Sequence, residues 1–363
     1  MGDSKLFRPI KVGNLTLSHR IVLAPMTRYR STERSHIPYV SIMKEYYTQR
    51  ASDPGTLLIT EATFVAQKAG IYKNALGAWT QAHGKRCDSP RSFIFCQLWA
   101  LGRTADYIDL KDENPSLDLV APSAIKLTDS FETPQKIPKS KKLTKKERTS
   151  TECALMDFSK TRLGFDGIEV HGANGYLIDQ FLQDVSNQRT DEYGGSIKNR
   201  ARFGLAVLDA VVQAIGPRCT GIRLSPWSTA QDMGMQDPVP TFSYFVSEVK
   251  RRHPDLAYLH VVEPRVAVDR SRKASALESN DSIRRIWAPK PLISAGGYTR
   301  ESAMQTADRK GDIIAFGRYF ISNPDLTARL KESIPFTPYN RSTFYLHGEV
   351  AEGYIDYPFT SEL

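Results

Sequence analysis

Eight short apolar runs, rich in β-branched residues, recur along this 363-residue sequence and limit the folds that it can adopt. Each run is almost continuously apolar, whereas a strand with one face in water alternates apolar and polar residues. Strands that are buried on both faces have this pattern, and they belong mainly to parallel sheets covered by helices. The eight runs span residues 21–25, 57–62, 93–99, 167–170, 221–226, 257–263, 291–297 and 313–320.

Helix-like stretches separate several of these runs, so strand and helix alternate along the chain. They cover residues 40–51, 197–215, 242–252, 282–287 and 299–307, and the last opens with a T-R-E-S sequence typical of a capping box. Eight such repeats predict an α/β fold, the (β/α)8 TIM barrel, as a single domain over residues 1–363. A doubly wound open sheet is the alternative, but no G-x-G-x-x-G motif follows the first strand.

The charge and cysteine patterns exclude several classes of function. The net charge is +9, yet seven of the basic residues lie in one proline-broken run, 136–148, without interleaved aromatic residues. This run is typical of a solvated loop, so we expect no nucleic-acid partner. The four cysteines form no C-x-x-C pair, so no metal site is expected.

The sequence also lacks the signals of membrane or secreted proteins. The first 20 residues contain no apolar leader, and no stretch of about 18 apolar residues occurs. We therefore expect a cytoplasmic protein with no membrane partner.

Polar residues and glycines follow most of the predicted strands, where a barrel of this kind carries its functional groups. The last two strands end in Gly296-Gly297 and Gly317-Arg318. Glycines let backbone N–H groups approach phosphate oxygens, and arginine adds a planar cationic fork. These residues predict a site for a phosphorylated cofactor or substrate, although the glycines could also serve only to turn the chain.

Three side chains of one short loop could converge on a small molecule. His171 and Asn174 are hydrogen-bond donors, and Tyr176 is a phenol that stays protonated at neutral pH. Together they indicate polarisation of a carbonyl group followed by proton donation, although a lone tyrosine is more often a packed core residue. Arg223, at the end of a buried strand, requires an anion in the cavity because a guanidinium is rarely buried unpaired.

Seven segments of the chain resemble old yellow enzyme, the FMN-dependent ene-reductase family. They are APMTRYR, LLITEATF, FIFCQLWALGR, the long segment from GFDGIEVHGANGYLIDQFL to NQRTDEYGGSIKNRARF, ISAGGYT, IAFGRYFISNPDL and FYLHGEVAEGYIDYP. The resemblance runs from Leu6 to Pro358 with two gaps, and fungal members of the family have the most similar sequence motifs. It implies a noncovalent FMN, NADPH or NADH as the hydride donor, and a monomer or homodimer.

The resemblance also implies roles for residues around the cofactor. The backbone of Pro25, Met26 and Ala62 would contact the flavin. Thr27 would hydrogen-bond its O4 edge and Gln97 its pyrimidine end, while Arg223 would lie near N1 and O2. The phosphate cradle would consist of Gly296, Gly297, Gly317 and Arg318.

On the substrate side, the resemblance implies that His171 and Asn174 hold the carbonyl or nitro oxygen, with His171 also next to the flavin. Tyr176 would be the proton donor, and Trp99 and Tyr345 would border the pocket. The expected activity is reduction of the activated C=C bond of an enone or enal, in fungal specialised metabolism such as that of ergot-alkaloid aldehydes.

Two segments depart from the family pattern. Residues 81–92 replace a full amphipathic helix, and Gly84 and Pro90 oppose helix formation there. Residues 145–163 form a shorter stretch with a weaker apolar stripe than the family's long helix. Real divergence and an error in the gene sequence both explain these gaps. The alternative to an active enzyme is therefore a catalytically impaired or misfolded relic of the family. A third hypothesis is a barrel that acts on a phosphorylated sugar or CoA ester, but the ring of Thr27, Gln97 and Arg223 argues against it.

Overall fold

Eight parallel strands close into a barrel in the computed structural model, which describes residues 4–77, 92–128, 141–142, 164–267 and 270–361. Each strand pairs with the next along the chain, and the last pairs with the first, so the (β/α)8 prediction is confirmed. The barrel strands are β3 (Ile21–Leu23), β4 (Leu57–Ile59), β7 (Phe93–Trp99), β10 (Gly167–Gly172), β11 (Thr220–Leu224), β12 (Tyr258–Val262), β15 (Leu292–Ala295) and β16 (Ile313–Phe316).

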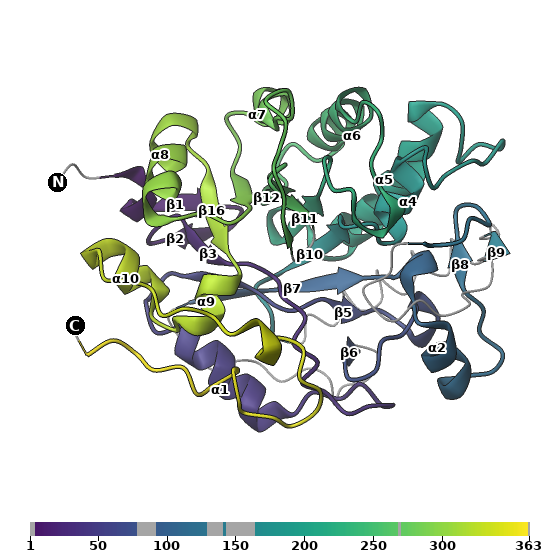
Figure 1. Cartoon of the computed structure of the whole chain (residues 1–363). Helices are drawn as coiled ribbons and strands as arrows, with labels where there is room; N and C mark the ends of the chain where they lie inside the picture. Colours follow the sequence, from purple (N-terminus) through teal and green to yellow (C-terminus); the bar gives the residue numbers. More distant parts are fainter. Residues whose placement is uncertain (1–3, 78–91, 129–140, 143–163, 268–269, 362–363) are drawn as a thin grey trace.

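Helices surround the barrel, and the five predicted helical stretches are confirmed. Figure 1 shows α5, α6, α7 and α8 in a row on one side of the barrel, with α1, α9 and α10 on the other. None of the described helices is long and apolar enough to cross a membrane. The helices are α1 (Val40–Arg50), α2 (Tyr107–Glu113), α4 (Leu177–Leu182), α5 (Ile197–Ile215), α6 (Val239–Arg252), α7 (Asp281–Trp287), α8 (Arg300–Lys310), α9 (Arg318–Ser322) and α10 (Leu326–Glu332).

Two local predictions can be compared with the structure at the ends of α8 and β16. The capping box of α8 is present, with Thr299 and Ser302 each bonding the other's backbone N–H. The predicted strand 313–320 is wrong in its second half, because β16 ends at Phe316 and α9 begins at Arg318. Gly317, with φ −100° and ψ −85°, breaks the extended backbone there.

Short strand pairs lie outside the barrel or in its loops. The hairpin of β1 (Ile10–Val12) and β2 (Leu15–Leu17) contributes Val12 and Leu17 to the same buried cluster as the barrel interior, so it covers one end of the barrel. The other short strands are β5 (Thr63–Phe64), β6 (Leu76–Gly77), β8 (Val120–Ala121), β9 (Lys141–Lys142), β13 (Val266–Ala267) and β14 (Arg270–Ser271).

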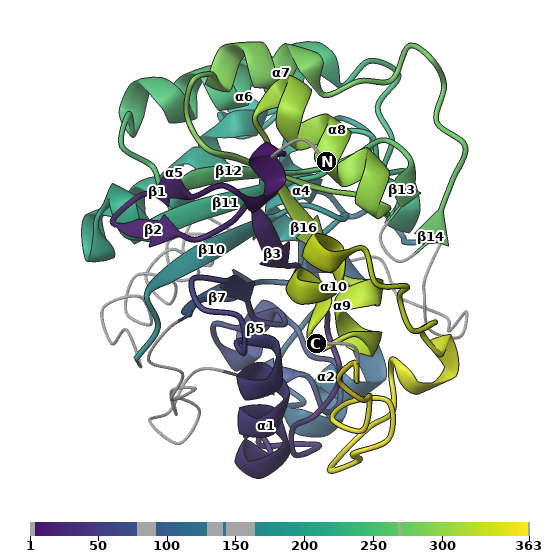
Figure 2. The same cartoon turned by 90° about the vertical axis from the view of Figure 1, so that its left-hand side faces the viewer.

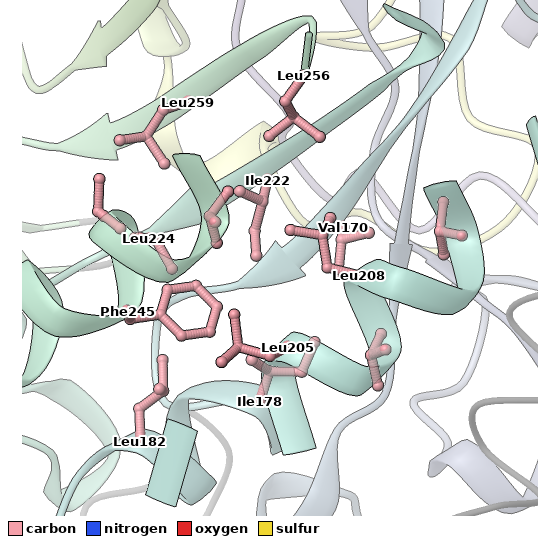
Figure 3. Close-up of a cluster of buried hydrophobic side chains, with 14 of the residues drawn as sticks. Val170, Ile178, Leu182, Leu205, Leu208, Ile222, Leu224, Phe245, Leu256 and Leu259 are labelled. Atoms are coloured by element: carbon pink, nitrogen blue, oxygen red, sulfur yellow. The ribbon is translucent and has the colours of Figure 1, made fainter. Parts of the chain in front are cut away.

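The largest apolar cluster lies between the barrel wall and α4, α5 and α6. Ser196 caps α5 by accepting the Asn199 N–H, and the helix ends before Gly216, whose φ is +86°. Between these limits, apolar residues at helical spacing form one buried stripe. Figure 3 shows Leu205 and Leu208 of this stripe close to Ile178 and Val170, with Ile222 and Phe245 beside them.

Inside the barrel, two strand glycines make room for two aromatic rings. A Cβ on Gly167 would lie 2.3 Å from the Phe95 ring, and a Cβ on Gly221 would lie 2.4 Å from the Tyr258 ring. Both rings are fully buried, with centroids 5.5 Å apart. They fill the barrel below the polar residues described in the next subsection.

The two shortened segments lie almost entirely outside the residues that the structure describes. The predicted loss of the second barrel helix concerns residues 81–92, of which the structure describes only Ser92. The predicted shortening over 145–163 lies entirely outside the described residues.

Three buried arginines attach the C-terminal segment to the barrel. Arg28, Arg30 and Arg50 are each at most 1% exposed and donate to backbone carbonyl oxygens between Phe344 and Tyr354. The Arg50 guanidinium also lies 3.6 Å from the centroid of the Tyr46 ring. Figure 2 shows this C-terminal segment, in yellow, running beside α1. The attachment therefore depends on main-chain acceptors rather than on carboxylates of the segment.

Replacing Arg50 by Ala should lower the free energy of unfolding by roughly 3–5 kcal/mol. The carbonyl oxygens of Tyr46, Phe320 and Ile321 would lose a buried donor, at about 1–3 kcal/mol each. Urea denaturation followed by circular dichroism measures the change. Lys44→Ala, on the exposed side of the same helix, is the control and should stay within about 0.5 kcal/mol of the wild type. A loss below 1 kcal/mol for Arg50→Ala would contradict the role of these bonds.

Candidate functional site

A cavity of about 280 Å³ opens among the loops that follow β3, β12, β15 and β16, with Arg223 of β11 in its wall. Parallel barrel strands all end at the same rim, so residues far apart in sequence meet there. Seven of the predicted cofactor residues line the cavity: Pro25, Met26, Arg223, Gly296, Gly297, Gly317 and Arg318. The structure therefore brings the predicted phosphate residues together with the loop after the first strand.

The glycines of the cavity allow close approach of the backbone. Gly297 has φ +64°, and a Cβ there would lie 3.3 Å from the Arg318 guanidinium. A Cβ on Gly317 would lie 3.0 Å from the Met26 sulfur atom. Side chains at these positions would crowd the space, so the cradle suits a ligand that is bound by backbone groups.

Arg318 provides a cation beside these glycines. Its guanidinium donates to the Tyr339 hydroxyl at 3.3 Å and to Ser271 Oγ at 3.1 Å. No described carboxylate lies within ion-pair distance of it. A guanidinium that has only neutral partners keeps its full attraction for a phosphate group.

Arg223 lies deeper in the same cavity and is 9% exposed. Its Nε is buried and has no hydrogen-bond partner among the described residues. Burial lowers the pKa of this guanidinium, whereas the charge of Glu169 raises it. A buried cation with an unsatisfied donor fits a ligand that brings hydrogen-bond acceptors.

The rings of Trp99, His171 and Tyr176 pack against one another next to this cavity. The Tyr176 centroid lies 4.9 Å from that of His171 and 4.7 Å from that of Trp99, both edge to face. Arg223 links this group to the cavity, because its charge acts on both His171 and Tyr176. Trp99 on β7, His171 on β10 and Tyr176 in the loop after β10 are therefore close together.

His171 is held as a neutral hydrogen-bond donor. Burial lowers the pKa of its imidazole well below the ordinary value, and the charge of Arg223 lowers it further. Its Nδ1 accepts the Ala173 N–H at 3.2 Å, so the proton of the neutral ring is on Nε2. This tautomer can donate to a carbonyl oxygen without carrying charge.

The loop carrying Asn174 is fixed by buried partners that sequence reasoning did not identify. Asn174 has φ +59°, and its N–H donates to Ser225 Oγ at 2.6 Å. Asp179 accepts the Gly175 N–H at 2.9 Å, and burial raises the pKa of its carboxyl to about 6. The side-chain Oδ1 of Asn174 is buried without a partner in the described chain. These bonds fix the loop backbone, and Asn174 Oδ1 is left as a buried acceptor.

Four other predicted residues lie near these groups but do not line the cavity. Ala62 is buried in one apolar cluster with Trp99 and Tyr176, and Thr27 is half-buried after Met26. Tyr345 is 40% exposed and packs edge-on to Tyr29 at 6.0 Å, beside Phe344 of the cavity wall. Gln97 is buried and donates from Nε2 to Glu169 at 2.6 Å.

Glu169 and His260 are polar residues of this region that the sequence did not single out. Both are fully buried, and His260 Nδ1 lies 2.8 Å from Glu169 Oε2. Glu169 is the charged residue of the run GIEV, and His260 lies in the middle of the run AYLHVV. The sequence did contain a signal for both residues, because charged or titratable side chains are rare in strands that are buried on both faces.

The sequence and the fold match known flavin enzymes. The model of the NADH:flavin oxidoreductase / NADH oxidase family matches residues 5–336. The chain is 44% identical to a chanoclavine-I aldehyde reductase of Penicillium roqueforti over 99% of this chain and 97% of that protein. It is 41% identical to a probable inactive reductase of Epichloe festucae var. lolii, over 100% and 97% of the two chains. The crystal structure of old yellow enzyme from a Pichia species matches with a TM-score of 0.88 and 36% identity, over 99% and 95%.

Replacing Arg318 by Gln should weaken the binding of FMN roughly 10- to 100-fold. A hydrogen bond to a charged group contributes about 1.5–3 kcal/mol, and this variant removes the cation from the glycine cradle. Fluorescence titration of the flavin-free protein with FMN gives the dissociation constant. Arg309→Gln, an equal change of charge on the exposed side of α8, should leave it unchanged. Equal affinities for the two variants would show that the phosphate is bound elsewhere.

Proposed function

Because the chain belongs to the NADH:flavin oxidoreductase / NADH oxidase family, we propose that it is an FMN-dependent, NAD(P)H-driven ene-reductase of the old yellow enzyme type. Its reaction is reduction of the activated C=C bond of an α,β-unsaturated carbonyl compound. The observation that carries this proposal is the position of Arg223, a buried cation between the glycine cradle and the ring pair of His171 and Tyr176.

The residues of the cavity suit FMN. Gly296, Gly297, Gly317 and Arg318 would hold the phosphate, and Arg223 would donate to acceptor atoms of the ring system. The backbone of Pro25, Met26 and Ala62, with Thr27 and Gln97, would complete the contacts. When bound, FMN takes a hydride from the nicotinamide donor and delivers it to the substrate.

The substrate oxygen would be bound by His171 and Asn174. The Nε2–H of His171, on β10, and the side-chain amide of Asn174, on the loop that follows, would be the donors, and a neutral imidazole polarises a carbonyl group without an ion pair to break. Donation to this oxygen makes the β-carbon more electrophilic. Trp99 and Tyr345 would border the space for the rest of the substrate.

Tyr176 would supply the proton that completes the reaction at the α-carbon. A phenol is protonated at neutral pH and is a suitable acid toward a basic carbanion or enolate. Its backbone is fixed at the start of α4, and its ring is packed against both His171 and Trp99. This packing limits the positions that the hydroxyl group can take.

We propose small enals or enones of fungal specialised metabolism as substrates, which the name of the Penicillium roqueforti relative supports. The cytoplasmic location and the monomeric or dimeric state stay predictions from the sequence, as does a single domain over residues 1–363.

The alternative is an impaired relic of the family, which the name of the Epichloe relative and the two shortened segments favour. The intact cavity and ring cluster support the active enzyme instead. Purification separates the two, because an active member is yellow, with FMN bound, and oxidises NADPH or NADH when an enone is added. A folded but colourless protein that takes up no FMN would overturn the proposal.

Replacing His171 by Leu together with Asn174 by Leu should abolish binding of phenols to the FMN-loaded protein. Both donors to the ligand oxygen are lost, so the long-wavelength absorbance band of a phenolate stacked on oxidised flavin should disappear. A spectrophotometric titration with a phenol measures this. The flavin spectrum without phenol is the control for FMN content, and a band of undiminished strength would exclude these residues as the ligand clamp.

Replacing Tyr176 by Phe should separate the two half-reactions. Reduction of the flavin by NADPH needs no proton from this residue, so its rate should stay nearly constant. Oxidation of the reduced enzyme by an enone should slow by about 10²–10⁴-fold, as expected for a lost general acid. Stopped-flow absorbance measures each half separately. Tyr244→Phe on the outer helix α6 is the control, and equal slowing of both halves by Tyr176→Phe would assign this residue a structural role.

A further inference from the structure

The barrel interior beneath Arg223 contains a carboxylate and an imidazole, Glu169 and His260, that have no role in the proposed reaction. Glu169 Oε1 accepts from Gln97 Nε2 at 2.6 Å, and Glu169 Oε2 accepts from His260 Nδ1 at 2.8 Å. Glu169 and His260 have no exposed surface, and Gln97 is 1% exposed. A carboxylate so far from water is costly unless its surroundings stabilise the charge.

The strand register places this network next to Arg223 and below the cavity. Arg223 is paired with His260 on β12, which bonds Glu169 directly. On β10, Glu169 precedes His171 by two residues, so both side chains point to the same face of the strand. Gly221 is paired with Glu169, and because it has no side chain the Tyr258 ring fits next to it. Arg223 is therefore at the cavity wall, with Glu169 one layer deeper in the barrel.

The charge states follow from these neighbours. Burial alone would raise the pKa of Glu169, but His260, Arg223 and Gln97 outweigh it, so this pKa lies below its ordinary value. Burial lowers the pKa of His260. The network thus contains a carboxylate, a neutral imidazole that donates from Nδ1, and a guanidinium. Its two charges offset one another inside the barrel.

We propose that Glu169 is a positioning residue that sets the reduction potential of the bound FMN, because it offsets the charge of Arg223 from the side of Arg223 away from the cavity. This inference rests on the proposed function, in which FMN occupies the cavity that Arg223 lines. Hydride transfer to FMN adds one negative charge to the cofactor. Arg223 favours that charge, and Glu169 reduces how strongly it does so.

Replacing Glu169 by Gln tests this in the FMN-loaded protein. An amide is nearly the same shape but carries no charge. It can still bond both partners if Gln97 turns its side-chain amide to present the oxygen, or if His260 carries its proton on Nε2 instead of Nδ1. The equilibrium constant for reduction of FMN should rise about tenfold, which is a shift of roughly 30 mV toward positive potential for a two-electron couple. Reductive titration in the presence of a reference dye measures the potential without relying on turnover.

Glu169→Asp is the matched variant, because it keeps the charge while shortening the side chain. Its equilibrium constant for reduction should stay within about threefold of the wild type, even where thermal stability falls. A purely structural role of Glu169 would lower the thermal stability of both variants and leave the reduction potential of the bound FMN unchanged. If the Gln variant does not fold, Glu169→Ala takes its place as the uncharged variant: a positive shift of about tenfold in the equilibrium constant supports the carboxylate as the source of the effect, and an unchanged constant contradicts it.

The outcomes separate this inference from the proposed function. A wild type that binds FMN and reduces an enone, with an unmoved or more negative potential in Glu169→Gln, overturns the role of Glu169 alone. A folded wild type that binds no FMN overturns both proposals. A positive shift in Glu169→Gln that Glu169→Asp does not show supports Glu169 as the residue that offsets Arg223.

Discussion

Backbone pairing between the first and last barrel strands is the constraint on which the site depends. β3 and β16 are parallel neighbours, and the pairing continues past them through the Ala24 N–H, which donates to the Phe316 carbonyl at 2.9 Å. This places Met26 against Gly317, although the two lie at opposite ends of the chain. The glycine cradle, Arg318 and the loop after β3 share one cavity only because the barrel closes in this way.

The barrel could be predicted from the sequence because its strands are buried on both faces. Such strands give continuous apolar runs, and the eight runs coincide with the eight barrel strands. The error at residues 313–320 has the same origin, since only Gly317 and Arg318 separate the apolar IIAF sequence from the aromatic residues of α9. A single glycine with an unusual ψ separates strand from helix there, and apolar periodicity does not detect it.

The site was predictable only where a residue stands at a strand end or in a recognisable motif. Arg223 could be identified as a buried cation that needs an acceptor, and the structure gives it no partner for Nε among the described residues. Glu169, His260 and Asp179 were missed because their partners come from other strands or turns of the fold. The sequence gives each residue's chemistry, but the barrel register decides which of these groups meet in a medium of low dielectric constant.

Because arginines hold the C-terminal segment by its backbone, the path of that segment does not depend on which side chains it carries. Arg28 and Arg30 bond carbonyl oxygens, which every residue type possesses, so a substitution at an exposed position of residues 345–352 leaves these bonds intact. Tyr345, which is exposed beside Phe344 of the cavity wall, is one such position. The anchored backbone therefore allows the rim of the pocket to diversify during evolution, and substrate range can change while the cofactor cavity and the barrel stay as they are.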